Sequence, residues 1–168
     1  MTSIEIKNLS LNLNNHEILN DISEIIPSGK LYYLMGTAGS GKTSFLKAIN
    51  GLFMEVKGTI YVDGENIYNW GPKQMLAYHR RCSFIFQNSA LIGNMNILEN
   101  LSLSYSYHTS LDKVEITDKL MPLLDFFNLH PSILMERPHF LSTGQRMLLN
   151  IIRGLLEETQ NFFWDEPI

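Results

Sequence analysis

The sequence has 168 residues, of which 45% are hydrophobic and 18% are charged, and its formal net charge at pH 7 is -4. This length and this balance are typical of one globular domain with an ordinary core, and they exclude a disordered or fibrous chain. The acidic balance argues against a general binder of nucleic acid or of anionic membranes, because both functions need a basic surface.

The single cysteine, Cys82, cannot form an internal disulfide. No segment reaches the roughly 20 consecutive apolar residues that a membrane-spanning helix needs. The first residues, MTSIEIKN, lack the basic and then apolar pattern of a secretory signal. We therefore expect a cytoplasmic chain.

Two strands are predicted at the start of the chain. Apolar residues alternate over residues 4–13, with a slip of phase at Lys7-Asn8 that a β-bulge would explain. A second strand is expected over residues 18–26, because the turn signal Pro27-Ser28-Gly29 follows it. These two segments predict half-buried strands.

A strand, a glycine-rich loop and a helix are predicted next. The apolar run KLYYLM, residues 30–35, is typical of a buried central strand. The pattern becomes helical from Lys42 to Asn50, and Gly51 is placed to cap the end of this helix. Gly36 ends the strand and begins the loop between them.

The middle of the chain predicts a hairpin, a short helix and another strand. Asp63-Gly64 is a tight-turn dipeptide between strand formers. Pro72 suits the first position of a helix that reaches about His79. The run CSFIF, residues 82–86, predicts a buried strand.

The second half of the chain is predicted to be mainly helical. From about residue 93 to residue 140 the pattern is amphipathic and interrupted by prolines, as expected of a helical subdomain inserted into an α/β core. Ser142 is expected to be the N-cap of a helix that runs to about Glu158. The run NFFW, residues 161–164, predicts a last strand.

The segment GTAGSGKT, residues 36–43, matches the phosphate-binding loop pattern. Small residues allow consecutive backbone N–H groups to surround phosphate oxygens, and the following helix adds the positive end of its dipole. Lys42 is expected to reach the β- and γ-phosphates, and the Thr43 hydroxyl is expected to bind Mg²⁺. The alternative is a chance glycine-rich turn. The residues expected to bind ATP in this loop are Gly36, Thr37, Ala38, Gly39, Ser40, Gly41, Lys42, Thr43 and Ser44.

An apolar run followed by two carboxylates, NFFWDEPI, ends the sequence. Taken alone, Asp165 and Glu166 are typical of a solvated strand end. Beside a phosphate-binding loop, Asp165 can hold Mg²⁺, and Glu166 can orient or deprotonate the attacking water. The pair therefore predicts hydrolysis of ATP.

Two further motifs select the class of ATPase. Gln87 follows the CSFIF strand, and LSTGQ, residues 141–145, begins the last predicted helix. Alone, Gln87 would be a solvent-facing polar residue and LSTGQ an N-cap turn. In this order, with a helical insertion between them, the motifs resemble the nucleotide-binding domain of ABC transporters over nearly the whole chain.

This resemblance implies roles for the motif residues. Gln87 would contact Mg²⁺ and the attacking water and would couple the site to a membrane partner. LSTGQ resembles the LSGGQ signature, so Ser142, Gly144 and Gln145 would bind the γ-phosphate of a nucleotide held by a second subunit. Two copies in a head-to-tail C2 arrangement would then enclose two ATP molecules. The implied metal ligands are Thr43, Gln87 and Asp165.

The resemblance also implies partners and a location. The partners would be integral-membrane permease subunits and a second ATP-binding subunit, with no nucleic acid. The chain would lie in the cytoplasm, peripherally on the inner face of the membrane. The segments DGENI and FQNSALIGNMNILENL are most similar to the ATPases of Mla/Mce-type lipid transport systems. This similarity implies lipid transport as one possibility, but other subunits select the substrate in such systems.

The expected fold class is α/β, a P-loop NTPase core of ABC type over residues 1–168 with an N-terminal antiparallel sheet region and a helical subdomain inserted at about 93–140. Three departures from the family pattern stand out. Leu13 has no ring where an aromatic residue usually stacks on adenine, although His16 is near, so ATP and GTP are expected to bind similarly. Thr143 replaces a signature glycine. The sequence stops after the strand and carboxylate pair NFFWDEPI, which resembles the Walker B motif of the family. We therefore expect the C-terminal part and the γ-phosphate histidine to be missing and turnover by this chain alone to be low.

Two alternatives remain open. A non-transport ABC ATPase of DNA repair or translation would be expected to carry long insertions or tandem domains, and the sequence shows neither. A truncated fragment that only binds nucleotide is the other. The sequence leaves open the transported substrate and the direction of transport.

Overall fold

The computed structural model describes residues 3–53, 55–87, 89–108, 112–157 and 159–165. The chain divides into two compact units, Met1–Cys82 and Ser83–Ile168, called here the N-terminal unit and the C-terminal unit. Each unit is described by itself.

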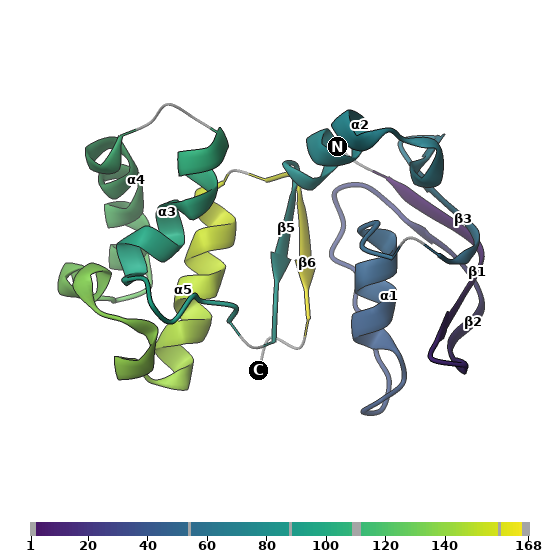
Figure 1. Cartoon of the computed structure of the whole chain (residues 1–168), viewed down its shortest axis with the longest axis horizontal. Helices are drawn as coiled ribbons and strands as arrows, with labels where there is room; N and C mark the ends of the chain where they lie inside the picture. Colours follow the sequence, from purple (N-terminus) through teal and green to yellow (C-terminus); the bar gives the residue numbers. More distant parts are fainter. Residues whose placement is uncertain (1–2, 54, 88, 109–111, 158, 166–168) are drawn as a thin grey trace. The chain divides into compact units, whose positions relative to one another are not determined.

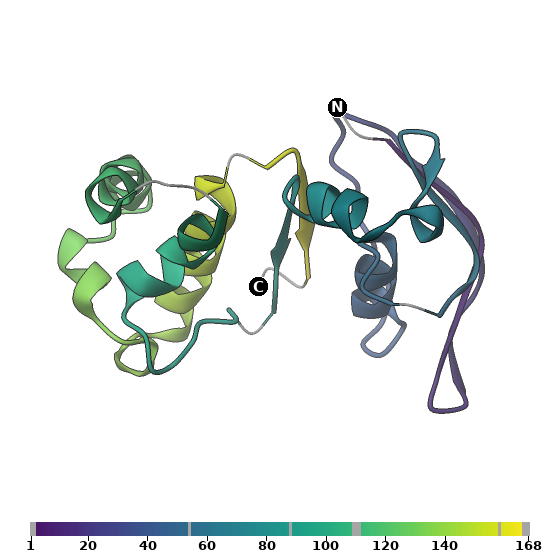
Figure 2. The ribbon, with the colours of Figure 1, turned by 45° about the horizontal axis from the view of Figure 1, so that its top comes forward.

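An antiparallel sheet forms the frame of the N-terminal unit. The strands follow the order β2-β1-β3-β4, and β1 and β2 form a long hairpin (Figure 2). The predicted alternation is confirmed, because Ile4, Ile6, Leu9 and Leu11 are all buried. The strands are β1 (Ile4–Leu13), β2 (His16–Ile26), β3 (Lys57–Val62) and β4 (Glu65–Asn66).

The predicted slip of phase in β1 is a β-bulge. The pairing of β1 shifts register after Ile6 toward β2 and after Lys7 toward β3. Asn8 has a φ of 51°, and its backbone N–H donates to the Ser23 hydroxyl at 2.9 Å. Because an extra residue is inserted there, the apolar residues on both sides of the bulge reach the same core.

The prediction of a buried central strand at residues 30–35 is wrong. Residues 30–35 lie in no strand of the described chain, and Leu31, Tyr33 and Met35 are 80%, 77% and 90% exposed. Apolar composition shows only that a segment can be buried, whereas a strand also needs a neighbour that accepts its backbone hydrogen bonds. Both edges of β1 are already occupied, by β2 and β3.

Besides the sheet, the described residues of the N-terminal unit form α1 (Lys42–Ile49) and α2 (Pro72–His79), both as predicted, and a short 3-10 helix (Ile67–Asn69). The buried face of α1 consists of Phe45, Ala48 and Ile49. The Tyr78 hydroxyl of α2 donates to the backbone oxygen of Ile49 at 3.2 Å, and His79 Nε2 lies 2.8 Å from the backbone oxygen of Asn50. These contacts join α2 to the end of α1.

The C-terminal unit combines two paired strands with helices (Figure 1). Strand β5 (Cys82–Ile85) pairs with β6 (Asn161–Trp164), and the chain between them forms α3 (Ile97–His108), α4 (Lys113–Phe126), two short 3-10 helices (Pro131–Met135 and Pro138–Phe140) and α5 (Thr143–Leu156). Side chains from these helices form one apolar core, whose most buried members are Ile97, Leu101, Leu120, Leu149 and Ile152.

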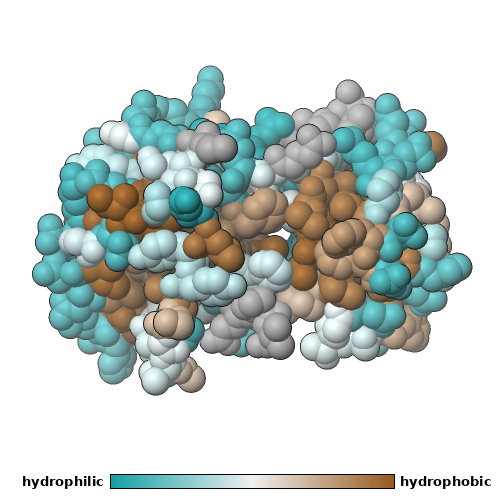
Figure 3. Space-filling model, turned by 180° about the vertical axis from the view of Figure 1, so that it is seen from behind, coloured by the Kyte–Doolittle hydropathy of each residue, from teal (hydrophilic) through white to brown (hydrophobic). Residues whose placement is uncertain are grey.

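Apolar side chains also reach the surface of both units (Figure 3). No helix of the described ranges is long and apolar enough to span a membrane.

Candidate nucleotide-binding site

The glycine-rich loop of the N-terminal unit begins with a turn and ends at α1. The backbone N–H of Ser40 donates to the backbone oxygen of Thr37 at 3.2 Å. Gly39 and Gly41 have φ values of +78° and +87°, which glycine adopts without the strain that a Cβ atom would cause. A Cβ on Gly41 would also lie 2.8 Å from the backbone oxygen of Ile18. The sequence therefore needs glycine at these positions to make the loop.

The N-terminus of α1 points into this loop. Its N-cap residue is Gly41, which makes no side-chain cap bond, and the first turn of the helix contains no acidic residue. The positive end of the helix dipole is therefore not neutralised by a carboxylate of its own first turn. Thr43 and Ser44 belong to that turn, and both are half-buried. This arrangement suits an anion such as a phosphate group.

Lys42 lies against the backbone of the same loop. Its Nζ atom donates to the backbone oxygens of Gly36 at 3.1 Å and Thr37 at 2.9 Å. The ammonium is therefore held next to the loop rather than extended into solvent. A phosphate oxygen bound there would exchange a contact with a neutral carbonyl for a stronger contact with a charged partner.

In the C-terminal unit, Gln87 and Asp165 lie at the same end of the β5–β6 pair. The backbone N–H of Asp165 donates to the backbone oxygen of Ile85 at 3.0 Å, and Gln87 is two residues beyond Ile85. Gln87 is exposed, whereas Asp165 is only 4% exposed. The alternative interpretation of Asp165 as part of a solvated strand end is therefore wrong. Glu166 falls outside the described residues, so its role stays a prediction.

The signature residues form the beginning of α5. The Ser142 hydroxyl accepts from the backbone N–H of Gln145 at 3.2 Å, and the Gln145 side chain accepts from the backbone N–H of Ser142 at 3.0 Å. This reciprocal pair is a capping box, so the predicted N-cap role of Ser142 is confirmed. Gly144 is exposed, and a Cβ there would meet no close neighbour.

Thr143, which departs from the glycine of the family signature, has a defined place. Its hydroxyl accepts from Arg146 Nη2 at 3.2 Å. Arg146 Nη1 also donates to the backbone oxygen of Leu141 at 3.1 Å. The substituted position is therefore part of a hydrogen-bonded turn, and its side chain is held by the next turn of α5.

The signature and the Gln87 segment lie two helical turns apart along α5. Asn150 follows Ser142 by eight residues, which is about 12 Å along a helix axis. The Asn150 amide donates to the backbone oxygen of Phe86 at 3.0 Å. Because a hydrogen bond spans only about 3 Å, Ser142 and a group at Phe86 cannot bind the same phosphate oxygen.

Sequence reasoning missed two residues of this unit, Asn150 and Arg153. Arg153 donates to the backbone oxygens of Ala90 at 3.1 Å and Ser89 at 3.4 Å, and to Asn150 Oδ1 at 2.7 Å. Burial lowers the pKa of the Arg153 guanidinium, and the Glu157 carboxylate opposes this shift. The guanidinium stays charged at neutral pH. The overlooked signal was a polar residue within the apolar run LLNII.

No group of three or more His, Cys, Asp and Glu residues in the described ranges could hold a metal ion by itself. The expected metal ligands, Thr43, Gln87 and Asp165, offer hydroxyl, amide and carboxylate oxygens. Mg²⁺ prefers oxygen ligands and in nucleotide sites is bound by one or two carboxylates together with phosphates and water. Each of these side chains, taken by itself, offers an oxygen of that kind.

A family model described as ABC transporter matches residues 19–168. The chain belongs to the ABC transporter family. This match includes the phosphate-binding loop, Gln87, the signature and Asp165, so the family predicted from those motifs is confirmed.

Curated ABC relatives match over most of this chain. The probable ribonucleotide transport ATP-binding protein mkl of Mycobacterium leprae is 31% identical, over 98% of this chain and 47% of the relative. The sulfate/thiosulfate import ATP-binding protein CysA of Escherichia coli K12 is 33% identical, over 98% of this chain and 44% of the relative. The chain thus spans about half the length of the curated relatives it matches.

Solved structures have the same ABC cassette fold. A dimeric ATP-binding cassette in a post-hydrolysis state, bound to ADP and Pi, superposes with a TM-score of 0.84 at 24% identity, over 98% of this chain and 74% of that one. An ATP-binding subunit of an ABC transporter gives a TM-score of 0.80 at 28% identity, over 98% and 66%. The predicted α/β fold of ABC type is confirmed.

Proposed function

We propose that this chain binds Mg-ATP and hydrolyses it as part of an ABC transporter ATP-binding subunit. The observation that carries the proposal is the geometry of the phosphate-binding loop, in which two glycines of positive φ lead into the N-terminus of α1. Lys42 lies against that loop. A cation, small residues and a helix N-terminus together recognise a polyphosphate rather than a single small anion.

The residues divide the chemistry between binding and water activation. Lys42 would bind the β- and γ-phosphates, with Thr43, Gln87 and Asp165 as ligands of Mg²⁺, which when bound neutralises charge on the phosphate oxygens. Glu166 would orient or deprotonate the attacking water, and Gln87 would position it. Asp165 suits a metal ligand because Mg²⁺ prefers carboxylate oxygens, and Asp165 lies at the same end of the β5–β6 pair as Gln87.

A second copy of the subunit would complete each site. Within one chain the signature lies about 12 Å along α5 from the residue that contacts Phe86, so it can serve a nucleotide other than the one at Gln87. A head-to-tail C2 pair satisfies this requirement, with Ser142, Gly144 and Gln145 facing the partner's γ-phosphate. The dimeric state of a solved cassette of the same fold supports this arrangement.

The transporter would include integral-membrane permease subunits, with this chain on their cytoplasmic side. The names of the curated relatives, which refer to transport and import, support a transport role. We propose a lipid as the transported substrate, from the similarity of DGENI and FQNSALIGNMNILENL to lipid-transport ATPases. Co-purification of the tagged subunit with its membrane proteins, followed by lipid analysis, tests this. A permease that carries bound ribonucleotide or sulfate instead of lipid would contradict the lipid substrate.

The test of ATP binding compares two lysines of the same helix. Lys42→Ala should weaken Mg-ATP binding by about 10- to 150-fold, because a charge-assisted contact contributes about 1.5–3 kcal/mol. Lys47→Ala removes an equal charge from the last turn of α1 and should leave the affinity unchanged. Titration calorimetry measures both. Equal affinities of wild type and Lys42→Ala would contradict the proposed site.

A further inference from the structure

The Gln87 loop, defined here by Phe86, Gln87, Ser89 and Ala90, is held by side chains of α5. Asn150 donates to the backbone oxygen of Phe86, on one side of Gln87. Arg153 donates to the backbone oxygens of Ser89 and Ala90, on the other side. Gln87 therefore lies between two anchored points, and both anchors come from one helix.

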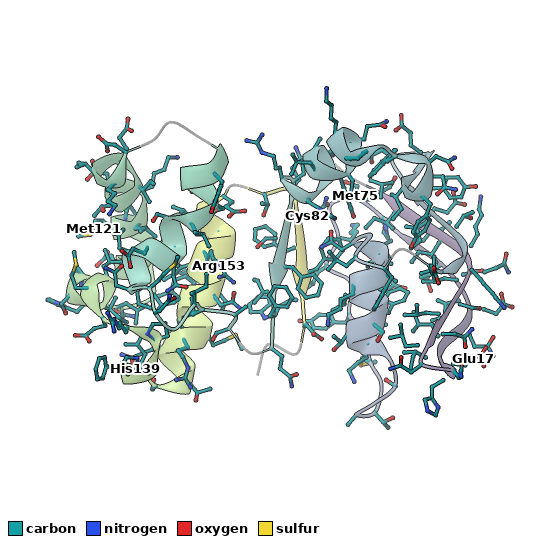
Figure 4. The ribbon with its side chains drawn as sticks, in the orientation of Figure 1. Glu17, Met75, Cys82, Met121, His139 and Arg153 are labelled. Atoms are coloured by element: carbon teal, nitrogen blue, oxygen red, sulfur yellow. The ribbon has the colours of Figure 1, made fainter. Side chains whose placement is uncertain are left out.

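The two anchoring side chains also contact each other. Asn150 Oδ1 accepts from Arg153 Nη2 at 2.7 Å, so the amide is oriented with its N–H₂ group toward Phe86. Arg153 lies on α5 in Figure 4, one helical turn after Asn150. The three loop carbonyls and the two side chains thus form one hydrogen-bonded network.

The loop backbone needs this support. Ser89 and Ala90 have φ values of 25° and 46°, a left-handed region that residues with a Cβ atom rarely adopt. Such conformations persist only where the surroundings hold them in place. The backbone oxygens that accept from Arg153 belong to these same two residues.

The burial of Asn150 also indicates that this side chain serves to hold the loop. Asn150 is 1% exposed, and its neighbours on α5, Leu149 and Ile152, are fully buried apolar residues. An apolar side chain would satisfy packing at this position, whereas a buried amide is favourable only when it is hydrogen-bonded. Its bonds go to the Gln87 loop and to Arg153, so the loop explains why the position is polar.

A close approach of α5 to β5 makes the contacts possible. Gly154 lies where a Cβ atom would clash with the Ser83 hydroxyl and pack 3.6 Å from Ile85. The absence of a side chain at Gly154 lets the C-terminal half of α5 lie against the strand from which the Gln87 loop emerges. The N-terminal end of the same helix carries the signature.

We infer that Asn150 and Arg153 are positioning residues that fix the Gln87 loop to the signature helix, so that Gln87 and the signature move as one body. The inference rests on the proposed function, because positioning matters for catalysis only if Gln87 acts in ATP hydrolysis. Neither residue is among the expected nucleotide ligands, and their bonds go to the Gln87 loop and to each other. Their effect is on turnover, through the placement of Gln87, and not on the affinity of the phosphate-binding loop.

The test replaces each of the two anchoring side chains by a residue of similar size. Arg153→Lys keeps the charge, but all its N–H donors lie on one nitrogen, so it cannot reproduce the three bonds that the guanidinium makes from two nitrogens in a fixed planar geometry. Asn150→Asp keeps the acceptor for Arg153 but places an oxygen opposite the Phe86 carbonyl. Arg146→Lys is the matched control, since Arg146 makes similar fork bonds on the same helix but contacts Leu141 and Thr143 instead of the Gln87 loop. Thermal unfolding first confirms that every variant is folded.

Two measurements decide the inference. In both test variants, NMR order parameters of the Ser89 and Ala90 amides should fall from about 0.85 to below about 0.6, while those of α4 and those in Arg146→Lys stay unchanged. In the assembled ATPase, Arg153→Lys should lower kcat about tenfold with KM for Mg-ATP changed less than about twofold, because positioning acts on the transition state. Unchanged order parameters, or an equal fall in Arg146→Lys, would overturn the anchoring. Loss of turnover only through KM would overturn the positioning role. A wild-type protein that binds no ATP would overturn the proposed function, but the NMR result would still decide whether the loop is anchored.

Discussion

The two units present their functional segments in opposite ways. In the N-terminal unit, Lys42 bonds to carbonyls of its own exposed loop, and the N-cap of α1 is a glycine without a side chain. In the C-terminal unit, the signature is closed by a capping box, and the Gln87 loop is anchored by Asn150 and Arg153. One segment is thus open to an anion, and the other is already hydrogen-bonded before any ligand arrives.

This difference fits a division of labour. A binding loop gains affinity when its donors find their best partners only in the ligand, because weak internal contacts are then exchanged for charge-assisted ones. Groups that act in a transition state gain more from being fixed in advance, since no reorganisation is then needed during the reaction. The N-terminal unit is therefore expected to determine affinity, and the C-terminal unit to determine turnover.

Replacement of Glu166 tests this division most strongly. Glu166→Gln in the assembled ATPase should lower kcat by about 10²- to 10⁴-fold, because the amide keeps the shape of the carboxylate but is a far poorer base. Mg-ATP affinity should remain, in contrast to Lys42→Ala. Steady-state phosphate release and equilibrium titration measure the two properties. Wild-type turnover in Glu166→Gln would mean that the water is activated by another group.

Removal of Asn100 tests how far the C-terminal unit depends on buried polar contacts. Asn100 is 1% exposed, accepts from the Ile92 N–H at 2.6 Å and donates to the backbone oxygens of Ile92 and Asn96 at 3.1 and 2.9 Å. Asn100→Leu should lower the free energy of unfolding by about 2 kcal/mol, since the Ile92 N–H loses its acceptor, whereas the carbonyls of Ile92 and Asn96 keep their bonds from the Met95 and Asn100 backbone N–H groups.

The matched change in the N-terminal unit is Asn20→Leu. Asn20 is exposed on β2, and its side-chain amide donates to the Glu17 carboxylate at 3.1 Å. Its replacement should change the free energy of unfolding by less than about 0.5 kcal/mol. Urea denaturation measures both variants. Equal costs at the two positions would remove the contrast between the units.

Much of this contrast was visible in the sequence. The periodicity of apolar residues and the turn residues predicted β1 with its bulge, the Asp63-Gly64 hairpin, α2 from Pro72 and the N-cap at Ser142. Each of these features depends on residues that are close in sequence. The KLYYLM strand was predicted wrongly, because strand pairing depends on a partner that composition does not reveal. Asn150 was missed because its role depends on a carbonyl 64 residues away.

The cap of α5 provides a smaller test. Ser142→Ala should lower the free energy of unfolding by about 1 kcal/mol, because the N–H of Gln145 loses its acceptor. Ser142→Gly, which gives α5 the same N-cap residue type as α1, should cost only a few tenths of a kcal/mol, since glycine leaves that end open to water. Thermal unfolding of the two variants distinguishes them. An alanine variant as stable as wild type would show that the capping box contributes nothing.

The smallest expected effect lies in the N-terminal unit, at Tyr68. Its hydroxyl is buried and has no hydrogen-bond partner among the described residues. Burial raises the pKa of Tyr68 to about 12. Because the unfolded chain ionises near pH 10, it loses protons before the folded chain does, and stability falls as pH rises from about 10 to about 12. The ring is half-exposed, so solvent screening reduces this contribution to about 1 kcal/mol or less.

Tyr68→Phe should therefore leave the free energy of unfolding at pH 7 unchanged or raise it by less than about 1 kcal/mol, because an unpaired buried hydroxyl is removed. It should also make the loss of stability above pH 10 shallower. Some alkaline loss should remain, since burial raises the pKa of Tyr78 as well. Tyr33→Phe, at a 77% exposed position of the same unit, should change the stability at pH 7 by less than about 0.5 kcal/mol. Denaturation of both variants at pH 7 and at pH 11 measures these effects. If Tyr68→Phe were clearly less stable at pH 7, the hydroxyl would have a partner, and the N-terminal unit would depend on buried polar contacts much as the C-terminal unit does.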